Sequence, residues 1–258
     1  MDSIGNFAGK TVIVTGGARG IGRAITDRFL ESGANVLICA RRPPDSPNAS
    51  GGREAVFVAA DVREHDQIQK VVTFALQKWG RVDVLVNNAG GSPPADTATA
   101  SPRFSTAIIQ LNLIAPLLFS QAVNAVMQKQ SDGGTIVNVG SASGTRPSPG
   151  TAAYGAAKAG LLNLTESLAV EWAPRVRVNA VVAGPIRTEL AHLHYGDAAG
   201  MAAVAATIPM GRLGDPEDVA EACFYLASPQ SRFVTGASLL VHGGGERPAF
   251  LAAAVPQK

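Results

Sequence analysis

The amino-acid sequence predicts an α/β fold in which helices cover both faces of a doubly wound parallel sheet. Short β-rich runs alternate with helical patterns along the whole chain. Runs such as 84–86 and 136–139 are largely apolar without alternation, which is typical of strands buried on both faces. With 258 residues and 46% apolar content, the chain can bury one large core. We therefore predict a single domain over residues 1–258 with a seven-stranded parallel sheet.

The first predicted unit is a strand at 11–15, a glycine-rich turn and a helix at 20–32. The turn is Thr15-Gly16-Gly17-Ala18-Arg19-Gly20-Ile21-Gly22. Glycine lets the backbone turn tightly and approach a pyrophosphate, whose charge the amides at the helix N-terminus would meet. An ordinary glycine-rich turn between strand and helix is the alternative interpretation.

The later elements follow the same alternation. We predict further strands at 35–40, 55–60, 82–87, 134–140, 176–182 and 238–242, and helices at 64–79, 104–130, 151–173 and 216–228. The last helix has a clear start, because Asp215 can cap it, Pro216 suits its first position and two acids follow. Residues 43–52 hold three prolines and two glycines, which predict a loop that is mobile without ligand.

Tyr154 and Lys158 are four residues apart and share one helix face. An unperturbed tyrosine has a pKa near ~10, and a fixed cation beside it would lower that pKa toward working pH. The pair therefore suggests an acid/base centre that exchanges a proton with a substrate oxygen. By itself this spacing is equally compatible with a solvated surface pair.

Taken together, the motifs carry a family resemblance. The glycine turn, Asn87-Asn88-Ala89-Gly90, Asn112, Ser141, Tyr154 and Lys158 occur in order, within a match from about Lys10 to Gly244. This pattern resembles the ordinary-length branch of the short-chain dehydrogenase/reductase family. The resemblance implies a Rossmann-type fold and an NAD(P)-dependent oxidoreductase, which transfers hydride between a nicotinamide and a carbonyl or secondary alcohol.

The resemblance also implies four catalytic residues. Ser141 would hydrogen-bond the substrate oxygen, and Tyr154 would pass a proton to it during reduction. Lys158 would bind the nicotinamide ribose and hold down the pKa of the phenol, while Asn112 would anchor a water that links Lys158 to solvent. Assistance of this kind contributes about 10²- to 10⁴-fold to a rate.

Cofactor contacts follow from the same match. Asp61 and Val62 resemble the adenine contact, and Ile186 and Thr188 occupy positions that hold the nicotinamide carboxamide, although Ala183 stands where the family usually has proline. The full expected set is Gly16, Arg19, Gly20, Ile21, Gly22, Arg41, Arg42, Asp61, Val62, Asn88, Ala89, Gly90, Tyr154, Lys158, Gly184, Ile186 and Thr188.

Charge at the end of the second strand favours NADP (NADPH) over NAD. The strand ends at Ala40, where NAD-preferring relatives usually present an acid, and Arg41 follows. Arg19 in the glycine turn adds a second cation, and guanidinium groups suit a dianionic phosphate. NAD remains the alternative, since Arg41 and Arg42 would also suit a solvated loop.

The substrate is the least determined feature. Residues 189–212 should form a lid, with His192 and His194 beside the apolar run 198–208. An apolar lid favours a bulky or apolar carbonyl compound, such as a 3-oxoacyl thioester, a steroid or a polyketide fragment, although these residues could equally face the core. Two other functions stay open: a non-catalytic dinucleotide-sensing or scaffold protein, and an enoyl reductase, whose relatives tend to separate tyrosine and lysine further.

Composition bounds the partners and the compartment. A formal charge of +2 without a basic stripe gives no indication of nucleic acid, and Cys39 and Cys223 have no disulfide or metal-ligand spacing. Without a leader or an apolar run of about 18 residues, we expect a cytoplasmic protein that binds no metal and no membrane. The resemblance implies a homotetramer or dimer, and a C-terminal tail at about 246–258 either docks on a neighbour or is disordered.

Overall fold

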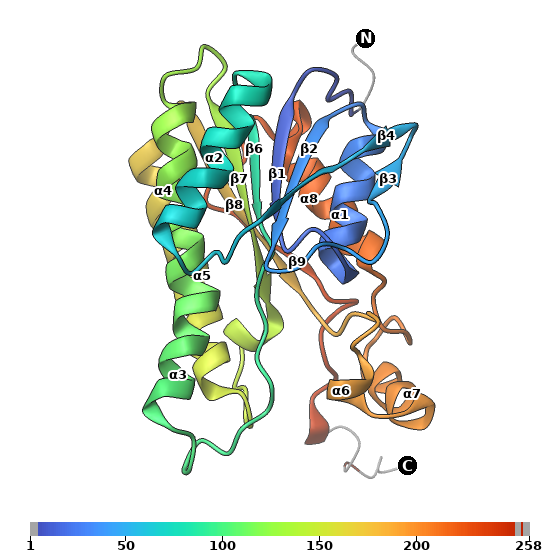
Figure 1. The fold of residues 1–258 in the computed structure, drawn as a ribbon. Coiled ribbons are helices and arrows are strands. Elements are labelled where there is room, and N and C mark those ends of the chain that lie inside the picture. The colour runs from blue at the N-terminus through green and yellow to red at the C-terminus, as the bar shows by residue number, and fades with distance from the viewer. Residues whose placement is uncertain (1–4, 251–253, 255–258) are drawn as a thin grey trace.

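A computed structural model describes residues 5–250 and 254. Its main sheet has seven parallel strands in the order β5-β2-β1-β6-β7-β8-β9 (Figure 1). The strands are β1 (Thr11–Thr15), β2 (Asn35–Ala40), β5 (Val56–Ala59), β6 (Val84–Asn87), β7 (Gly134–Ser141), β8 (Val176–Ala183) and β9 (Ser238–Val241). The prediction of a doubly wound, seven-stranded parallel sheet is confirmed.

Helices cover both faces of this sheet. On one face lie α2 (His65–Trp79), α4 (Ala115–Met127) and α5 (Ala152–Trp172), and on the other lie α1 (Gly20–Glu31) and α8 (Pro216–Ala227) (Figure 1). As predicted, Asp215 caps α8, and its backbone amide donates to the Asp218 carboxylate at 2.8 Å. This reciprocal capping fixes where the last helix begins.

The core consists of two apolar clusters, one on each face. In β1, Val12 and Val14 belong to the cluster under α1 and α8, while Ile13 belongs to the cluster under α2 and α4. Alternate side chains of a strand point to opposite faces, so both faces must be apolar. In the cluster under α1 and α8, Phe29 packs against Phe224 with ring centroids 5.4 Å apart.

The predicted helix at 104–130 is interrupted. The structure has α3 (Pro102–Ile109), a π-helical segment η1 (Gln110–Ile114) and then α4. The Asn112 side-chain amide donates to the Ile108 carbonyl at 2.9 Å, and Pro116 lacks the N–H that a regular helix would use next. This interruption, which periodicity does not reveal, is of the kind that often marks a functional site.

The whole helical segment Pro102–Met127 is long and apolar enough, by length and composition, to cross a membrane. The prediction that the chain lacks an apolar run of about 18 residues is therefore wrong. In the structure the segment is partly buried, and Phe119 and Val123 of α4 belong to the core cluster. It is a core helix that covers the sheet.

The prediction that residues 43–52 form a plain loop is wrong in its second half. Ala49–Ser50 (β3) pairs with Arg53–Glu54 (β4) in a short antiparallel hairpin. Gly51 and Gly52 both have positive φ, which is the backbone that tight two-residue hairpin turns require. The Asn48 side-chain amide anchors the segment by donating to the Gly17 carbonyl at 2.9 Å. Whether the segment is mobile stays a prediction.

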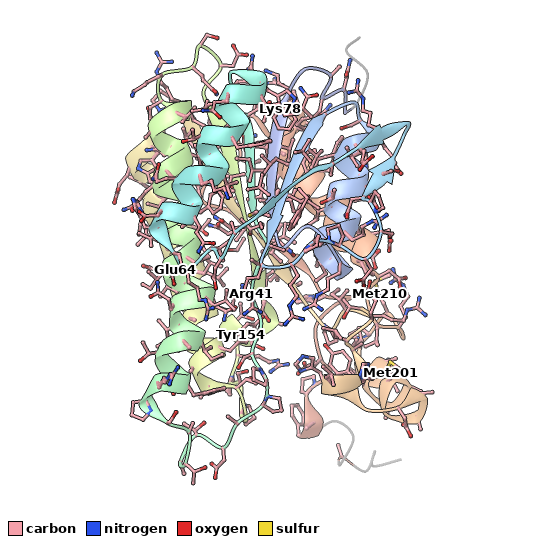
Figure 2. All side chains as sticks on the ribbon, in the orientation of Figure 1. Arg41, Glu64, Lys78, Tyr154, Met201 and Met210 are labelled. Atoms are coloured by element: carbon pink, nitrogen blue, oxygen red, sulfur yellow. The ribbon has the colours of Figure 1, made fainter. Side chains whose placement is uncertain are left out.

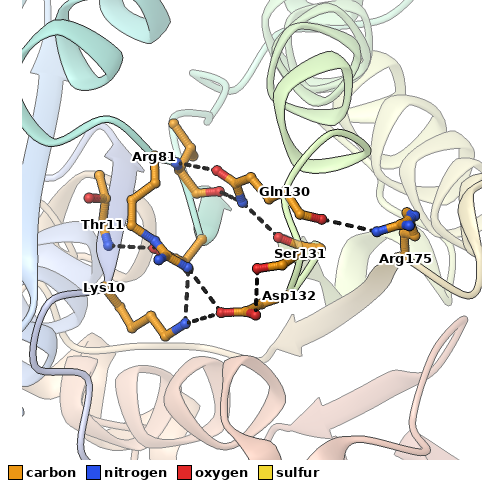
Figure 3. Close-up of polar contacts among 10 residues, drawn as sticks. Lys10, Thr11, Arg81, Gln130, Ser131, Asp132 and Arg175 are labelled. Atoms are coloured by element: carbon orange, nitrogen blue, oxygen red, sulfur yellow. Dashed lines mark hydrogen bonds and ion pairs between the residues drawn. The ribbon is translucent and has the colours of Figure 1, made fainter.

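The amino ends of the central strands are held by a polar network (Figure 3). Asp83 accepts a hydrogen bond from the Thr11 amide at 2.8 Å and forms ion pairs with Arg81 and Lys10. Lys10 also pairs with Asp132 at 3.0 Å, and hydrogen bonds from Lys10, Ser131 and Arg81 lower the pKa of Asp132 to about 2. The charged side chains at this end of the sheet therefore form ion pairs with one another. The cleft lies at the opposite, carboxyl end of the sheet.

Beyond the carboxyl ends of the strands, the chain extends on two sides. One extension is α3, and the other holds two short helices, α6 (His192–Tyr195) and α7 (Ala198–Thr207) (Figure 1). The second extension corresponds to the predicted lid at 189–212. Most of the predicted tail at 246–258 lies outside the described residues.

Candidate active site

A cleft of about 1180 Å³ runs along the carboxyl ends of the strands and under the lid. Parallel sheets of this topology bind ligands at this edge. The cleft brings together, from segments far apart in the chain, almost every residue that the sequence predicts to act there. Among the described residues, Asn112 alone of the predicted set does not line it. Figure 2 shows Tyr154 and Arg41 facing the space between the α3–α5 side and the lid.

The glycine turn after β1 forms one wall of the cleft. Gly16 has φ of +64°, and a Cβ there would lie 3.1 Å from the Ala89 Cα. A Cβ on Gly22 would lie about 2.1 Å from the Gly16 carbonyl oxygen, so no larger residue fits. The turn leads straight into α1, whose first amides and dipole attract an anion. These residues fit the pyrophosphate of a dinucleotide.

A carboxylate of the chain itself lies at this anion position. Glu189, at the start of the lid, accepts a hydrogen bond from the Gly20 amide at 3.3 Å. A Cβ on Gly20 would lie 3.5 Å from the other Glu189 carboxylate oxygen and 3.5 Å from the Thr188 methyl group. Glu189 therefore stands where a phosphate oxygen would be expected. No sequence motif indicates this position of Glu189, because Gly20 is 169 residues away along the chain.

Ser141, Tyr154 and Lys158 meet at the centre of the cleft. Ser141 ends β7, while Tyr154 and Lys158 share one side of α5. Lys158 Nζ donates to the Val139 carbonyl at 2.7 Å and lies 5.8 Å from the centroid of the Tyr154 ring. A fixed ammonium is thus close to the phenol, as the four-residue spacing predicts.

The pKa values differ from the expected direction. Burial raises the pKa of Tyr154, and a side-chain hydrogen bond with Ser141 offsets part of this rise. Burial also lowers the pKa of Lys158 to about 8. The expectation that the lysine brings the pKa of the phenol below its ordinary value is therefore wrong for this structure, because loss of water dominates both groups.

Asn112 lies behind the cleft wall and not in the cleft. Its side chain accepts from the Gly91 amide at 2.8 Å and donates to the Gly91 carbonyl at 3.0 Å. A Cβ on Gly90 would lie 2.7 Å from Asn112 Oδ1 and 3.4 Å from Lys158 Nζ. Asn112 and Lys158 therefore flank Gly90 closely, which gives Asn112 a position near the lysine, held by η1.

Four arginines line the end of the cleft beside β2 and β5. Arg41, Arg42 and Arg19 were predicted, and Arg63 was not. Arg63 binds the Asp61 carboxylate through two nitrogens, Nη2 at 2.5 Å and Nε at 2.9 Å, and lowers the pKa of Asp61. The expected adenine contact through Asp61 therefore competes with an internal ion pair. The sequence feature that could have indicated this ion pair is the position of Arg63 two residues after Asp61.

Charged and polar side chains are part of the cleft lining. Arg146 pairs with Glu246. Burial raises the pKa of Tyr195, and the charge of the Tyr154 phenolate adds to this rise. From the apolar run 198–208, Val204 and Thr207 line the cleft, and most of α7 is exposed or half-buried instead. The apolar wall that this run predicts is thus largely absent among the described lining residues. His194 lines the cleft as well.

Comparison with known proteins shows which family this chain resembles. A family model described as Enoyl-(Acyl carrier protein) reductase matches residues 16–246. The 3-oxoacyl-(acyl-carrier-protein) reductase FabG of Vibrio cholerae is 37% identical over 242 residues, covering 93% of this chain and 98% of its own. L-rhamnose 1-dehydrogenase (NAD(P)(+)) of Azotobacter vinelandii is 37% identical over 246 residues, covering 91% and 96%.

A solved structure agrees with the sequence relatives. The aldohexose dehydrogenase of Thermoplasma acidophilum in ligand-free form superposes with a TM-score of 0.87 at 30% identity, and the match covers 99% of each chain. Each of these matches covers more than nine tenths of both chains. The chain therefore belongs to the short-chain dehydrogenase/reductase family.

Proposed function

We propose that this NAD(P)-dependent oxidoreductase interconverts a carbonyl group and a secondary alcohol with NADP as its preferred cofactor. The family assignment carries the reaction class, which is action on CH–OH or C=O groups with NAD(P). The observation that supports turnover in this chain is the meeting of Ser141, Tyr154 and Lys158 at the centre of the cleft, beside the glycine turn.

In this proposal each residue has a separate role. The bound nicotinamide supplies or accepts the hydride. Ser141 hydrogen-bonds the substrate oxygen, and Tyr154 donates a proton to that oxygen in reduction or accepts one in oxidation. Lys158 binds the nicotinamide ribose, and its positive charge stabilises the phenolate form of Tyr154. Asn112 is bonded to the Gly91 backbone and anchors a water that links Lys158 to solvent.

The preference for NADP is supported by the arginines around the second strand. Arg41 and Arg42 follow Ala40 directly, and Arg19 lines the same end of the cleft. Arg63 neutralises Asp61, so this carboxylate repels an added phosphate less than a lone one would. A guanidinium can bind a phosphate through two parallel hydrogen bonds. The remaining predicted contacts, Val62, Asn88, Ile186 and Thr188 among them, line the rest of the cofactor path.

For the substrate, two directions are open. The composition of the lid favours a bulky or apolar carbonyl compound such as a 3-oxoacyl thioester, a steroid or a polyketide fragment, and a relative named as a 3-oxoacyl reductase fits that class. The polar lining and the relatives named as sugar dehydrogenases favour a polar compound. We give more weight to the side chains that line the cleft than to composition.

Enoyl reduction is the second candidate, because the matching family model carries that description. The four-residue spacing of tyrosine and lysine, seated beside Ser141, favours the carbonyl reaction instead. A non-catalytic, dinucleotide-sensing role has weaker support, since the tyrosine and the lysine are both present in the cleft.

Assembly and compartment are further parts of the proposal. We propose a homotetramer or dimer through α4, α5 and the edge strand β9, supported by the exposure of Val170 on α5 and Leu240 on β9. A reducing cytoplasm suits the two buried free thiols of Cys39 and Cys223. The whole of residues 1–258 would act as one catalytic domain, without a resident metal.

The direct test measures the absorbance of the reduced nicotinamide with a panel of ketones, aldehydes, enoyl thioesters and secondary alcohols. We expect turnover of carbonyl or alcohol compounds, and we expect Tyr154→Phe to remove most of it while cofactor binding, followed by fluorescence, stays within about 3-fold. Turnover of enoyl compounds alone would select the second candidate. Tight cofactor binding without any turnover would instead select the sensing role.

A further inference from the structure

An ion pair spans the lid end of the cleft. Arg146 follows the short turn after β7, and Glu246 follows β9, 100 residues later in the chain. Arg146 Nη2 donates to the Glu246 carboxylate, and Nη1 donates to the Pro147 carbonyl at 3.0 Å. The two side chains are 41% and 39% exposed, so the pair is held in place and yet within reach of a ligand.

The pair shares its space with the reacting group. Arg146, Tyr154, Tyr195 and Glu246 all line the same cleft. A substrate whose reacting oxygen meets Tyr154 would therefore extend toward the Arg146–Glu246 pair.

The cleft that holds the pair is also lined by other hydrogen-bonding groups. Besides the pair and the two tyrosines, the lining includes Ser92, Ser141, Ser143, Thr151, His194 and Thr207. Apolar residues line it as well, among them Leu111, Ile186, Leu190 and Val204. A substrate in this cleft therefore has both donors and acceptors within the lining.

These groups disfavour two classes of substrate. An apolar substituent seated against the pair would remove water from two charges and return no hydrogen bond, which is costly for binding. A carboxylate or phosphate on the substrate would meet Glu246, which already neutralises Arg146 and would repel a second anion. A hydroxyl group avoids both costs, since it can donate to a carboxylate and accept from a guanidinium.

We propose that the Arg146–Glu246 pair binds the hydroxyl groups of an uncharged, polyhydroxylated substrate, of the kind found in cyclic sugars and related polyols. This inference rests on the proposed function, because it assigns the substrate class of the same site. In the oxidation of such a compound, the hydroxyl-bearing carbon would give its hydride to the oxidised nicotinamide, and the hydroxyl would give its proton to the Tyr154 oxygen, which accepts it in the phenolate form.

The test compares two substrates with the same reacting group. Aldohexoses and tetrahydropyran-2-ol are both cyclic hemiacetals, but the second lacks all other hydroxyls. We expect kcat/KM for at least one aldohexose to exceed that for tetrahydropyran-2-ol by about 10²-fold or more, because sites built for hydroxyls reject analogues without them. The anionic alcohol 3-hydroxybutyrate and the apolar cyclohexanol complete the panel, and both should be poor substrates.

Variants then assign the effect to the pair. Arg146→Met and Glu246→Gln should raise KM for the preferred aldohexose about 10-fold or more, while tetrahydropyran-2-ol changes less than about 3-fold. Glu221→Gln is the matched control, since it breaks an exposed ion pair with Arg28 that does not line the cleft. Cofactor fluorescence titration checks that each variant is folded and binds normally.

The outcomes separate this inference from the proposed function. A preference for cyclohexanol, tetrahydropyran-2-ol or 3-hydroxybutyrate over every aldohexose overturns the inference and leaves the oxidoreductase intact. Equal losses with both hemiacetals in the variants also overturn it, since the pair would then only support the fold. The absence of turnover with the whole panel, together with all carbonyl compounds, overturns both.

Discussion

Glu189 accepts a hydrogen bond from the Gly20 amide at 3.3 Å and so joins the first residue of the lid to the first residue of α1. The amides at a helix N-terminus attract anions through their free N–H groups and the helix dipole. A carboxylate held at this point opposes the approach of a pyrophosphate. We therefore expect Glu189 and the pyrophosphate of the cofactor to compete for the amide of Gly20.

Replacement of Glu189 by glutamine should strengthen cofactor binding. The change removes a negative charge from the anion position but keeps the shape of the side chain, and one such charge at a helix N-terminus is equivalent to about 2- to 5-fold in affinity. Fluorescence titration of NADPH should show a lower Kd, with a larger difference at low salt. Glu171→Gln, an exposed position at the far end of α5, is the control and should bind like the wild type. Weaker binding in Glu189→Gln would contradict the competition.

Replacement of Arg41 should separate the two cofactors. Arg41→Ala removes a guanidinium beside Ala40, and we expect KM for NADPH to rise about 10- to 100-fold while KM for NADH changes less than about 3-fold. Arg53→Ala, an exposed arginine of β4, controls for the loss of one positive charge nearby. Equal effects on the two cofactors would mean that Arg41 does not contact the added phosphate.

The free enzyme should contain a tyrosine that ionises late. Burial raises the pKa of Tyr154, so in the cofactor-free state its phenol stays protonated above the ordinary tyrosine value. The chain has only 3 tyrosines, so the difference in phenolate absorbance between the wild type and Tyr154→Phe isolates this group during a pH titration. Its neighbours include Ser141 and Lys158. Ionisation below the ordinary value would show that Lys158 dominates after all.

Lys158 should make stability depend on pH. Its pKa is lowered to about 8 in the folded chain from 10.5, so between these values the unfolded chain binds more protons and stability rises with pH. At neutral pH the buried ammonium therefore costs free energy. Lys158→Met should raise the free energy of unfolding there by on the order of 1–3 kcal/mol, after loss of the bond to Val139.

Urea unfolding near neutral pH and again above the unfolded pKa would measure this effect. The gain from Lys158→Met should shrink at the higher pH, because the lysine is then neutral in both states. Lys129→Met, at an exposed position, should show no such dependence. A variant that is less stable than the wild type by the same amount at both pH values would rule out a buried charge at this site.

The sequence predicts the sheet well because each strand is set by a local apolar run. The bounds of β1 and β2 agree with prediction to the residue, and α1, α2 and α8 differ by a residue at one end. The elements that were not predicted depend on side chains that hydrogen-bond to backbone carbonyl groups. η1 requires Asn112 to bind Ile108, and the hairpin requires Asn48 to bind Gly17 across 31 residues.

The site shows the same division. Motif residues such as Ser141 and Tyr154 are recognisable in order along the chain, and they do meet in the cleft. Glu189 and the Arg146–Glu246 pair carry no motif, because their significance comes only from contacts across 100 residues or more. Likewise, the pKa of a buried group depends on how much water the fold removes, which spacing along a helix does not reveal.

A last prediction concerns the narrow space between Asn112 and Lys158. Gly90 has no positive φ that would demand glycine, so its requirement is steric: a Cβ would approach Asn112 Oδ1 to 2.7 Å. We expect Gly90→Ala to lower the free energy of unfolding by about 1–3 kcal/mol, because the asparagine must release Gly91 or Ile108. The displaced backbone and lysine should also lower kcat.

A double-mutant cycle tests the cause. If the clash with Asn112 is responsible, Gly90→Ala in an Asn112→Ala background should cost little beyond Asn112→Ala itself, so the two effects would be strongly non-additive. The same cycle measured on kcat tells whether the pair acts on catalysis through one contact. Additive losses in stability would place the requirement for glycine elsewhere, for example in the 3.4 Å approach to Lys158 Nζ. Gly90→Ala combined with Lys158→Met would then carry the non-additivity instead, because that change removes the ammonium from the same space.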